Sequence, residues 1–266
     1  MKTIKNQMSK HGISVVCTVW IIVSVFVLLR LLCPVDQCTF PRQHVLLSTF
    51  LQQAQTGDIL AVSYRTFPGQ LIRVFTRSVW SHVALVIRQG DKLYAVEMYR
   101  YEQQQHQPKT DTLSDVHIVP IQEWLQYNKH RPMAWSRHQG APIPSERLLQ
   151  VIHRLQQPPI QAKIDMIAFH WIDALRADKQ RQPLYCAKAL SRRNKSTNNS
   201  PCSGYRWNKF YCSELIAFLL QEMNVIGKTT LPGAYSPGAL LLGQLPFHPS
   251  HSLREPVWIK QTLGLV

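Results

Sequence analysis

Two short stretches of the sequence decide the fold: Trp80-Ser81-His82-Val83-Ala84-Leu85-Val86-Ile87 and, 130 residues later, Phe210-Tyr211-Cys212-Ser213-Glu214-Leu215-Ile216. The first places a histidine at the start of an apolar run that is long enough for one buried strand. The second places a cysteine in the first turn of an apolar helix, where free backbone N–H groups and the helix dipole favour the thiolate. An imidazole beside such a thiol takes its proton and later returns it. The two stretches therefore predict Cys212 as a nucleophile and His82 as its base.

A third residue completes the predicted site. Strands over residues 81–88 and 92–98 are joined by a tight turn at Gly90, so they run antiparallel and bring Glu97 near the same end as His82. A carboxylate at that place can orient the imidazole. The hydroxyls of Tyr64 and Tyr211 are candidates for stabilising an oxyanion. The cysteine spacings do not suggest zinc, and the sequence predicts neither a metal site nor a cofactor.

Four motifs occur along the chain in a characteristic order, namely Gly57-Asp58-Ile59-Leu60, Ser81–Ile87, Tyr94-Ala95-Val96-Glu97 and Tyr211–Ile216. Together they resemble the circularly permuted papain-like amidases of the NlpC superfamily, a group that includes YiiX/YaeF-type enzymes and the lecithin–retinol acyltransferase-like proteins. In the permuted enzymes the histidine strand precedes the cysteine helix, as it does here. The resemblance covers about residues 57–243, including the turn Tyr235-Ser236-Pro237-Gly238.

The resemblance implies an α+β fold in which a small antiparallel sheet is packed against helices, one of which carries the cysteine. It also implies Cys212 as the nucleophile, His82 as the base and Glu97 as the polar third residue. The acyltransferase-like relatives usually have a second histidine in the third position, so Glu97 favours the amidase branch.

The N-terminal part predicts a single-pass membrane anchor over residues 13–32. This run is mostly apolar, with Arg30 its only charged residue, and it just reaches the ~20 residues needed to cross a bilayer. Lysines precede it without any acid, which predicts a cytoplasmic N-terminus. A cleaved signal peptide and a lipoprotein signal ending at Cys33 are the alternatives, although no small-x-small cleavage site is present. The predicted organisation is a basic tail (1–12), the anchor (13–32), a juxtamembrane connector (33–56) and a catalytic domain (57–266).

The formal net charge of +15 is partly concentrated in one stretch. Residues 176–209 contain nine basic residues and one acid, and most of them lie in a predicted insertion over residues 180–209. This stretch is either a solvated loop or a patch that attracts anionic lipid or an anionic cell-wall polymer through residues such as Arg192, Arg193 and Lys195. No nucleic-acid-binding motif accompanies it, so we expect no nucleic-acid partner. Cys186 and Cys202 flank part of this stretch and could form a disulfide in an oxidising compartment.

Apolar periodicity and turn residues predict the remaining elements. Strands are expected at 59–62, 81–88, 92–98, 116–119, 132–136 and 257–260. Helices are expected at 46–54, 68–79, 145–156, 164–177 and 210–223, with a short helix starting at Ser236.

Three functions fit this sequence. The first is a membrane-anchored cysteine hydrolase that cleaves an amide, peptide or ester bond of a peptide, cell-wall or lipid substrate through an acyl-enzyme on Cys212. The second is an acyltransferase that uses the same thiol at a lipid surface. The third is a non-catalytic anchored module, against which the joint presence of Cys212, His82 and Glu97 argues.

Overall fold

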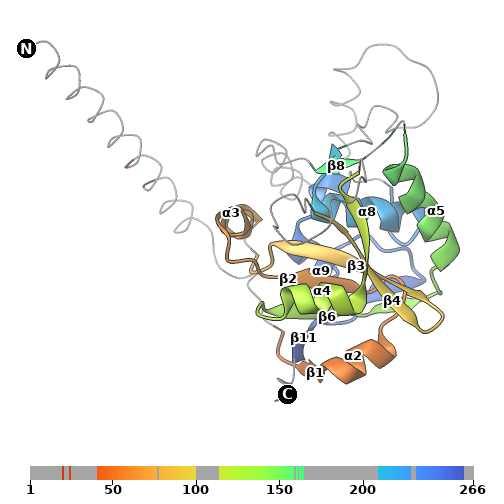
Figure 1. Cartoon of the computed structure of the whole chain (residues 1–266), viewed down its shortest axis with the longest axis horizontal. Coiled ribbons are helices and arrows are strands. Elements are labelled where there is room, and N and C mark those ends of the chain that lie inside the picture. The colour runs from red at the N-terminus through yellow and green to blue at the C-terminus, as the bar shows by residue number, and fades with distance from the viewer. Residues whose placement is uncertain are drawn as a thin grey trace, which may run out of the picture. The chain divides into compact units, whose positions relative to one another are not determined.

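A seven-stranded sheet with the strand order β1-β11-β6-β2-β3-β4-β5 organises the part of the chain that follows residue 40 (Figure 1). The computed structural model describes residues 41–76, 78–99, 114–158, 160, 162–164, 209–228 and 232–260, together with Trp20 and Ser24. The chain divides into two units, Met1–Thr39 and Phe40–Val266, and the fold described here is that of the second unit.

Neighbouring strands of the sheet are antiparallel except for the edge pair β1–β11, which is parallel. The strands are β1 (His44–Leu46), β2 (Ile59–Val62), β3 (His82–Gln89), β4 (Lys92–Met98), β5 (Val116–Pro120), β6 (Met133–Ser136) and β11 (Val257–Lys260). Two short two-stranded ladders lie outside it, made by β7 (His138–Gly140) with β10 (His251–Leu253) and by β8 (Lys163–Ile164) with β9 (Lys209–Phe210).

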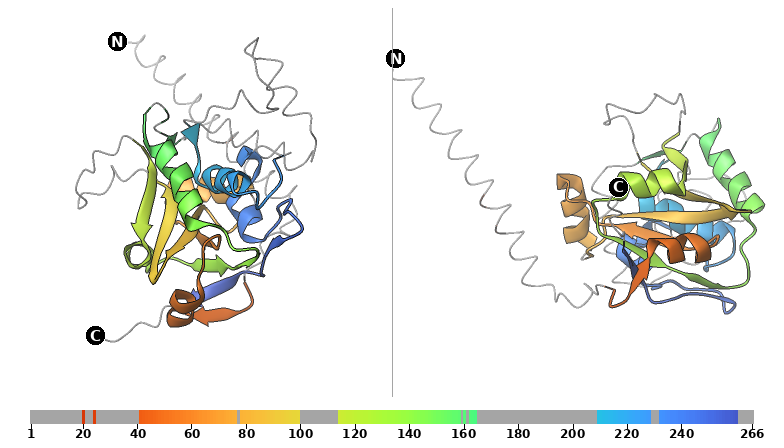
Figure 2. Two further views of the ribbon diagram at one scale, coloured as in Figure 1. Left: turned by 90° about the vertical axis from the view of Figure 1, so that its right-hand side faces the viewer. Right: turned by 60° about the horizontal axis from the view of Figure 1, so that its bottom comes forward.

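Helices cover both faces of the sheet, as the two views in Figure 2 show. The helices are α2 (Leu47–Gln53), α3 (Phe67–Thr76), α4 (Ile121–Asn128), α5 (Ser145–Gln156), α8 (Cys212–Glu222) and α9 (Pro237–Leu241), with a 3₁₀ turn, η2, at Pro232–Ala234. Helices α5, α8 and α9 contact β2, β3 and β4 from one side, whereas α4 contacts β4 and β5 and α2 contacts β1 and β11.

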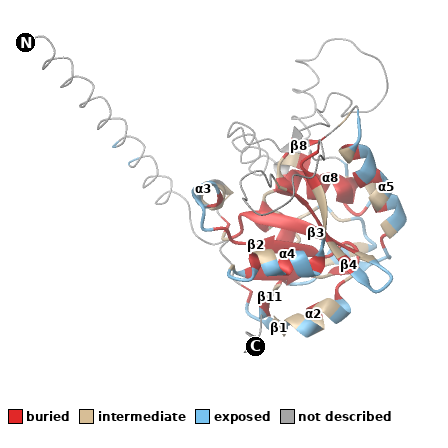
Figure 3. Cartoon of the chain, in the orientation of Figure 1, coloured by how far each residue is buried: buried red, intermediate tan, exposed pale blue. Residues whose placement is uncertain are grey.

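The core consists of two apolar layers, one on each face of the sheet, and α8 belongs to one of them. Figure 3 shows that β2, β3 and α8 are buried. Because side chains alternate across a strand, Ile59 and Ala61 of β2 enter the layer under α8, whereas Leu60 and Val62 enter the layer under α4. All four residues are fully buried, as expected for a strand between two neighbours and two helical layers.

Most of the predicted elements are confirmed, including both strands of the hairpin and the cysteine helix. Three differ. The sheet is not purely antiparallel, because β1 pairs with β11. Helix α4 lies where no element was predicted. Ile164, expected to begin a helix, is instead in strand β8.

The segment predicted as a juxtamembrane connector contributes to this unit. Strand β1 and helix α2 both fall within residues 33–56, and β1 is hydrogen-bonded to β11 near the C-terminus. The compact unit accordingly extends back to Phe40 rather than beginning at residue 57.

Nothing among the described residues is a helix that is both long and apolar enough to span a bilayer. The predicted anchor, residues 13–32, lies outside the described residues except for Trp20 and Ser24, which are helical and exposed. The loop at 103–113, the remainder of the helix predicted at 164–177 and the insertion at 180–209 also lie outside them.

The first motif, Gly57-Asp58-Ile59-Leu60, connects the start of β2 to β6 and β7. Gly57 has φ +97°, which disfavours any other residue there, and a Cβ atom would also lie 2.4 Å from Cδ1 of Ile143 and force that side chain to shift. The buried carboxylate of Asp58 accepts hydrogen bonds from the backbone N–H groups of Gln55 (3.0 Å) and His138 (2.8 Å) and from the indole N–H of Trp135 (2.7 Å). Burial raises the pKa of Asp58 to about 6, while the three donors act in the opposite direction.

The Asp58→Asn variant is expected to lose about 3 kcal/mol of unfolding free energy, because its amide would direct a donor at groups that already donate. Urea unfolding followed by circular dichroism measures the loss. Asp91→Asn is the matched control, since Asp91 lies in an exposed turn, and it should change the free energy by less than about 0.5 kcal/mol. Equal stability of the two variants would contradict the structural role of Asp58.

Candidate active site

Cys212 is the first residue of α8 and is nearly buried, with 8% of its surface exposed. The preceding residue, Tyr211, donates its backbone N–H to the carboxylate of Glu214 (3.2 Å), which closes the start of the helix. The N–H groups of the first helical turn have no acceptor within the helix. The Cys212 side chain therefore lies at the positive end of the helix dipole, which is the environment predicted from the sequence.

His82 is the first residue of β3 and is opposite Val62 of β2. The preceding residue, Ser81, fixes the start of the strand: its hydroxyl accepts the N–H of Tyr64 (2.7 Å) and donates to the carbonyl of Val62 (3.3 Å). The imidazole is consequently held at the end of the sheet by two neighbouring strands.

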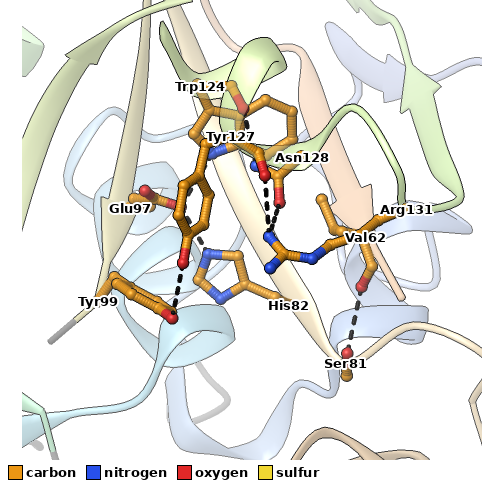
Figure 4. A network of polar contacts seen from close by, with 9 residues as sticks. All are labelled: Val62, Ser81, His82, Glu97, Tyr99, Trp124, Tyr127, Asn128 and Arg131. Carbon is orange, nitrogen blue, oxygen red and sulfur yellow. Dashed lines mark hydrogen bonds and ion pairs between the residues drawn. The ribbon is translucent and has the colours of Figure 1, made fainter. Parts of the chain in front are cut away.

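Glu97 of β4 holds the ring of His82 from the neighbouring strand. Its Oε2 lies 2.7 Å from Nε2 of His82 and also accepts the indole N–H of Trp124 (2.9 Å), as Figure 4 shows. Both carboxylate and imidazole are almost completely buried. Because an ionised carboxylate can only accept, Nε2 carries the hydrogen, and Nδ1 is the nitrogen left to exchange a proton with a thiol.

The charges of the three residues are coupled. Burial lowers the pKa of His82, but a hydrogen bond and charge interaction with Cys212, followed by those with Glu97, outweigh it and raise that pKa to about 10. The structure therefore brings together all three residues predicted from the sequence, in the arrangement thiol–imidazole–carboxylate. At neutral pH the arrangement favours an imidazolium between two acidic partners.

The two tyrosines predicted as oxyanion candidates differ in their surroundings. The hydroxyl of Tyr211 donates to the carbonyl of Gly233 in η2 and is thus already engaged. The ring of Tyr64 lies 5.4 Å from that of His82 between ring centroids, and its buried hydroxyl has no hydrogen-bond partner among the described residues. Burial raises the pKa of Tyr64 well above its usual value, so this hydroxyl is a proton donor at all relevant pH values.

Several residues around the site were not singled out from the sequence. Trp124 belongs to the unpredicted helix α4 and reaches Glu97 across the sheet face. Tyr99 and Tyr127 continue the aromatic cluster: Tyr99 is 6.0 Å from the His82 ring, and the two phenol oxygens are 3.1 Å apart. No local pattern could have revealed Trp124 and Tyr127, because their contacts depend on how α4 packs against β4, whereas Tyr99 directly follows β4 of the predicted hairpin.

The other predicted site residues, Arg192, Arg193 and Lys195, lie outside the described residues, as do Cys186 and Cys202. Within the described part of the chain Cys212 is a free thiol. No group of three or more histidine, cysteine, aspartate or glutamate side chains is arranged there to hold a metal ion.

Comparison with known proteins adds little to this geometry. No family model matches the chain. No curated protein matches it either. The chain is similar to the crystal structure of the metalloprotein yiiX from Escherichia coli O157:H7 (DUF1105), with 12% sequence identity over 79% of this chain and 98% of that chain. The TM-score of 0.32 is too low for residue roles to be transferred, so the candidate site rests on its own geometry.

Proposed function

We propose that this chain is a cysteine hydrolase of the permuted papain-like, NlpC-superfamily type, which cleaves an amide, peptide or ester bond through an acyl-enzyme on Cys212. The observation that carries the proposal is the buried line of contacts from Cys212 to His82 and from His82 Nε2 to Glu97 Oε2, the latter 2.7 Å long. A carboxylate, an imidazole and a thiol in this order supply an orienting group, a base and a nucleophile.

In the resting site His82 holds on Nδ1 the proton that Sγ of Cys212 has given up, and in the acylation step the thiolate attacks the carbonyl carbon of the substrate. The oxyanion that forms lies at the start of α8, where the N–H of Cys212 is available to stabilise it. The imidazolium then gives its proton to the leaving amine or alcohol, the bond from carbon to the leaving group breaks, and the acyl group remains on Sγ.

In the deacylation step, neutral His82 takes a proton from a water molecule, whose oxygen attacks the thioester carbon. The carbon–sulfur bond breaks, the acid is released, and the imidazolium returns its proton to sulfur or retains it in the ion pair. Glu97 and Trp124 hold the ring throughout both steps: the carboxylate stabilises the positive charge, and the indole N–H fixes the carboxylate.

The same acyl-enzyme would serve an acyltransferase if an amine or alcohol replaced water. One observation favours this second candidate: helix α3, which connects the strand before Tyr64 to the strand of His82, exposes 72% of Phe67 at its first residue. An exposed aromatic side chain three residues after Tyr64 in the sequence suits contact with a lipid surface. The proposed anchor at 13–32 and the basic stretch at 176–209 would also hold the enzyme at a lipid surface.

Intact-mass analysis after exposure to acyl donors tests the proposal and identifies the substrate class. Peptides, peptidoglycan fragments and phospholipids are supplied separately, and the donor that leaves an acyl adduct on Cys212 defines the bond that is cleaved. The acyl adduct is then left in buffer alone or in buffer that contains a competing amine. Release of the free acid indicates hydrolysis, and formation of the amide indicates transfer. An adduct that forms equally on the Cys212→Ala variant would refute the proposed nucleophile.

The Glu97→Gln variant is expected to fold normally and to lose about 10- to 100-fold in turnover, because the amide oxygen still accepts from His82 but the charge that stabilises imidazolium is gone. The loss of that charge also lowers the pKa of His82, so the alkaline limit of activity should move to lower pH. A pH–rate profile measures both effects. Glu123→Gln, a neutralised acid in the first turn of α4, is the matched control. Wild-type turnover in Glu97→Gln would mean that another group holds the ring.

A further inference from the structure

Arg131 follows α4 and is held rigidly beside the candidate site. Its Nη1 donates to Oδ1 of Asn128 (2.8 Å) and to the carbonyl of Tyr127 (3.2 Å). Asn128 is itself buried and donates to the carbonyl of Trp124, so the last turn of α4 fixes the orientation of the guanidinium. Figure 4 shows these contacts of the guanidinium with Asn128 and Tyr127.

The guanidinium is stacked on two of the rings that surround His82. Its Cζ lies 4.5 Å from the centroid of Tyr64 and 4.8 Å from that of Tyr127. Tyr64 in turn contacts the His82 ring, with centroids 5.4 Å apart, so a single aromatic side chain separates the cation from the base. Stacking leaves the edges of a planar guanidinium free for in-plane hydrogen bonds.

Some N–H donors of the Arg131 guanidinium have no acceptor among the described residues. Only Nη1 of Arg131 has hydrogen-bond partners there, and the residue forms no ion pair with any described acid. Arg131 is half-buried, so Nε and Nη2 reach solvent. The adjoining Tyr64 has a buried hydroxyl that lacks a partner in the same part of the chain. An oriented cation that has no counterion among the described residues, next to a buried donor that has no acceptor there, is an arrangement that can bind an anion.

We propose that Arg131, with the Tyr64 hydroxyl, is an anion-binding subsite that selects substrates carrying a carboxylate or phosphate group close to the bond attacked by Cys212. The inference rests on the proposed thiol chemistry and deepens it by naming a substrate feature. Both anions accept two parallel N–H bonds from one guanidinium edge, so they share the recognition chemistry. Arg131 is a binding residue in this account and takes no part in proton transfer.

Two alkylating reagents of similar size test the subsite without knowledge of the substrate. Iodoacetate is an anion and iodoacetamide is neutral, and both alkylate a thiolate by displacement of iodide. The measured quantity is the alkylation rate with iodoacetate divided by the rate with iodoacetamide, both at Cys212. We expect this ratio to be about three- to tenfold lower in Arg131→Met than in the wild type, because a positive charge that attracts the anionic reagent has been removed. High salt should also lower this ratio in the wild-type chain, because it screens the charge of Arg131.

The matched control is Arg147→Met, which removes the same charge at the opposite end of α8, where Arg147 donates to the carbonyl of Glu222. It should leave the ratio unchanged. If Arg131 only balances the charge of Glu97, both reagents will slow together and the ratio will not move, which would overturn the proposal. Failure of Cys212 to react with either reagent in the wild-type chain would instead overturn the proposed function.

A second measurement on the wild-type chain covers the case in which Arg131→Met does not fold. Inorganic phosphate and succinate, each at constant ionic strength, should slow alkylation of Cys212 by iodoacetamide, and a neutral diol should not. Stronger protection by succinate assigns a carboxylate substrate, and stronger protection by phosphate assigns a phosphate-bearing one. No protection by either anion would contradict the subsite.

Discussion

The Cys212→Ala variant is expected to show no measurable turnover, a loss of at least about 10⁴-fold, on any substrate that the wild-type chain cleaves. Without Sγ no acyl-enzyme forms, and no other free cysteine is present among the described residues to replace it. The side chain is small and nearly buried at the start of α8, so the variant should remain folded. Product formation under saturating enzyme measures the loss, and thermal unfolding checks the fold.

Ser213→Ala is the matched control for this result. Ser213 occupies the next position of the same helical turn, and its buried hydroxyl has no partner among the described residues. Removing that hydroxyl should leave turnover unchanged and stability equal or higher. Residual turnover of Cys212→Ala within about tenfold of the wild type would exclude covalent catalysis by this thiol.

The His82→Ala variant is expected to lose about 10³-fold in turnover, because the thiol loses the base that takes its proton. Alkylation by iodoacetamide should change in a characteristic way. The pKa of His82, raised to about 10 by Cys212 and Glu97, keeps the imidazolium charged at pH 6, so the wild-type thiol should react there. In the variant the rate should instead climb steadily with pH, as it does for a thiol without a neighbouring base.

His153→Gln is the control for that profile, since His153 is exposed in the last turn of α5. It should retain the wild-type rate at pH 6. If His82→Ala reacts as fast as the wild type at this pH, His82 is a structural residue of β3 rather than the base.

The central part of the site could be predicted from the sequence because its geometry is local. His82 and Glu97 belong to one hairpin, and a tight turn at Gly90 fixes which ends of β3 and β4 meet. The structure accordingly places the two side chains 2.7 Å apart. Cys212 was recognisable because a helix start is visible in the apolar pattern that follows it.

The rest of the site depends on contacts that no local pattern encodes. Trp124 reaches Glu97 only because α4 packs against β4 and β5, and α4 is a short helix that begins directly after Pro120. Arg131 is placed by the end of the same helix. The engagement of the Tyr211 hydroxyl by Gly233 likewise depends on a turn that lies 22 residues further along the chain.

The edge of the sheet was unpredictable for a similar reason. Strand β1 has only three residues and pairs with β11, more than 200 positions away. β11 was predicted as a strand, but β1 is too short to show the alternation of a half-buried strand, so its segment reads as part of a connector until its partner is known.

Limited alkylation with iodoacetamide at pH 6, followed by peptide mapping of all six cysteines, tests the central claim most directly. A thiol activated by a neighbouring imidazolium reacts at a pH where ordinary thiols are protonated. We expect Cys212 to be labelled at least about tenfold faster than Cys186 or Cys202, and this advantage to disappear in His82→Ala. Labelling of Cys186 and Cys202 as fast as Cys212 in the folded wild-type chain would contradict the proposal that Cys212 is an activated nucleophile.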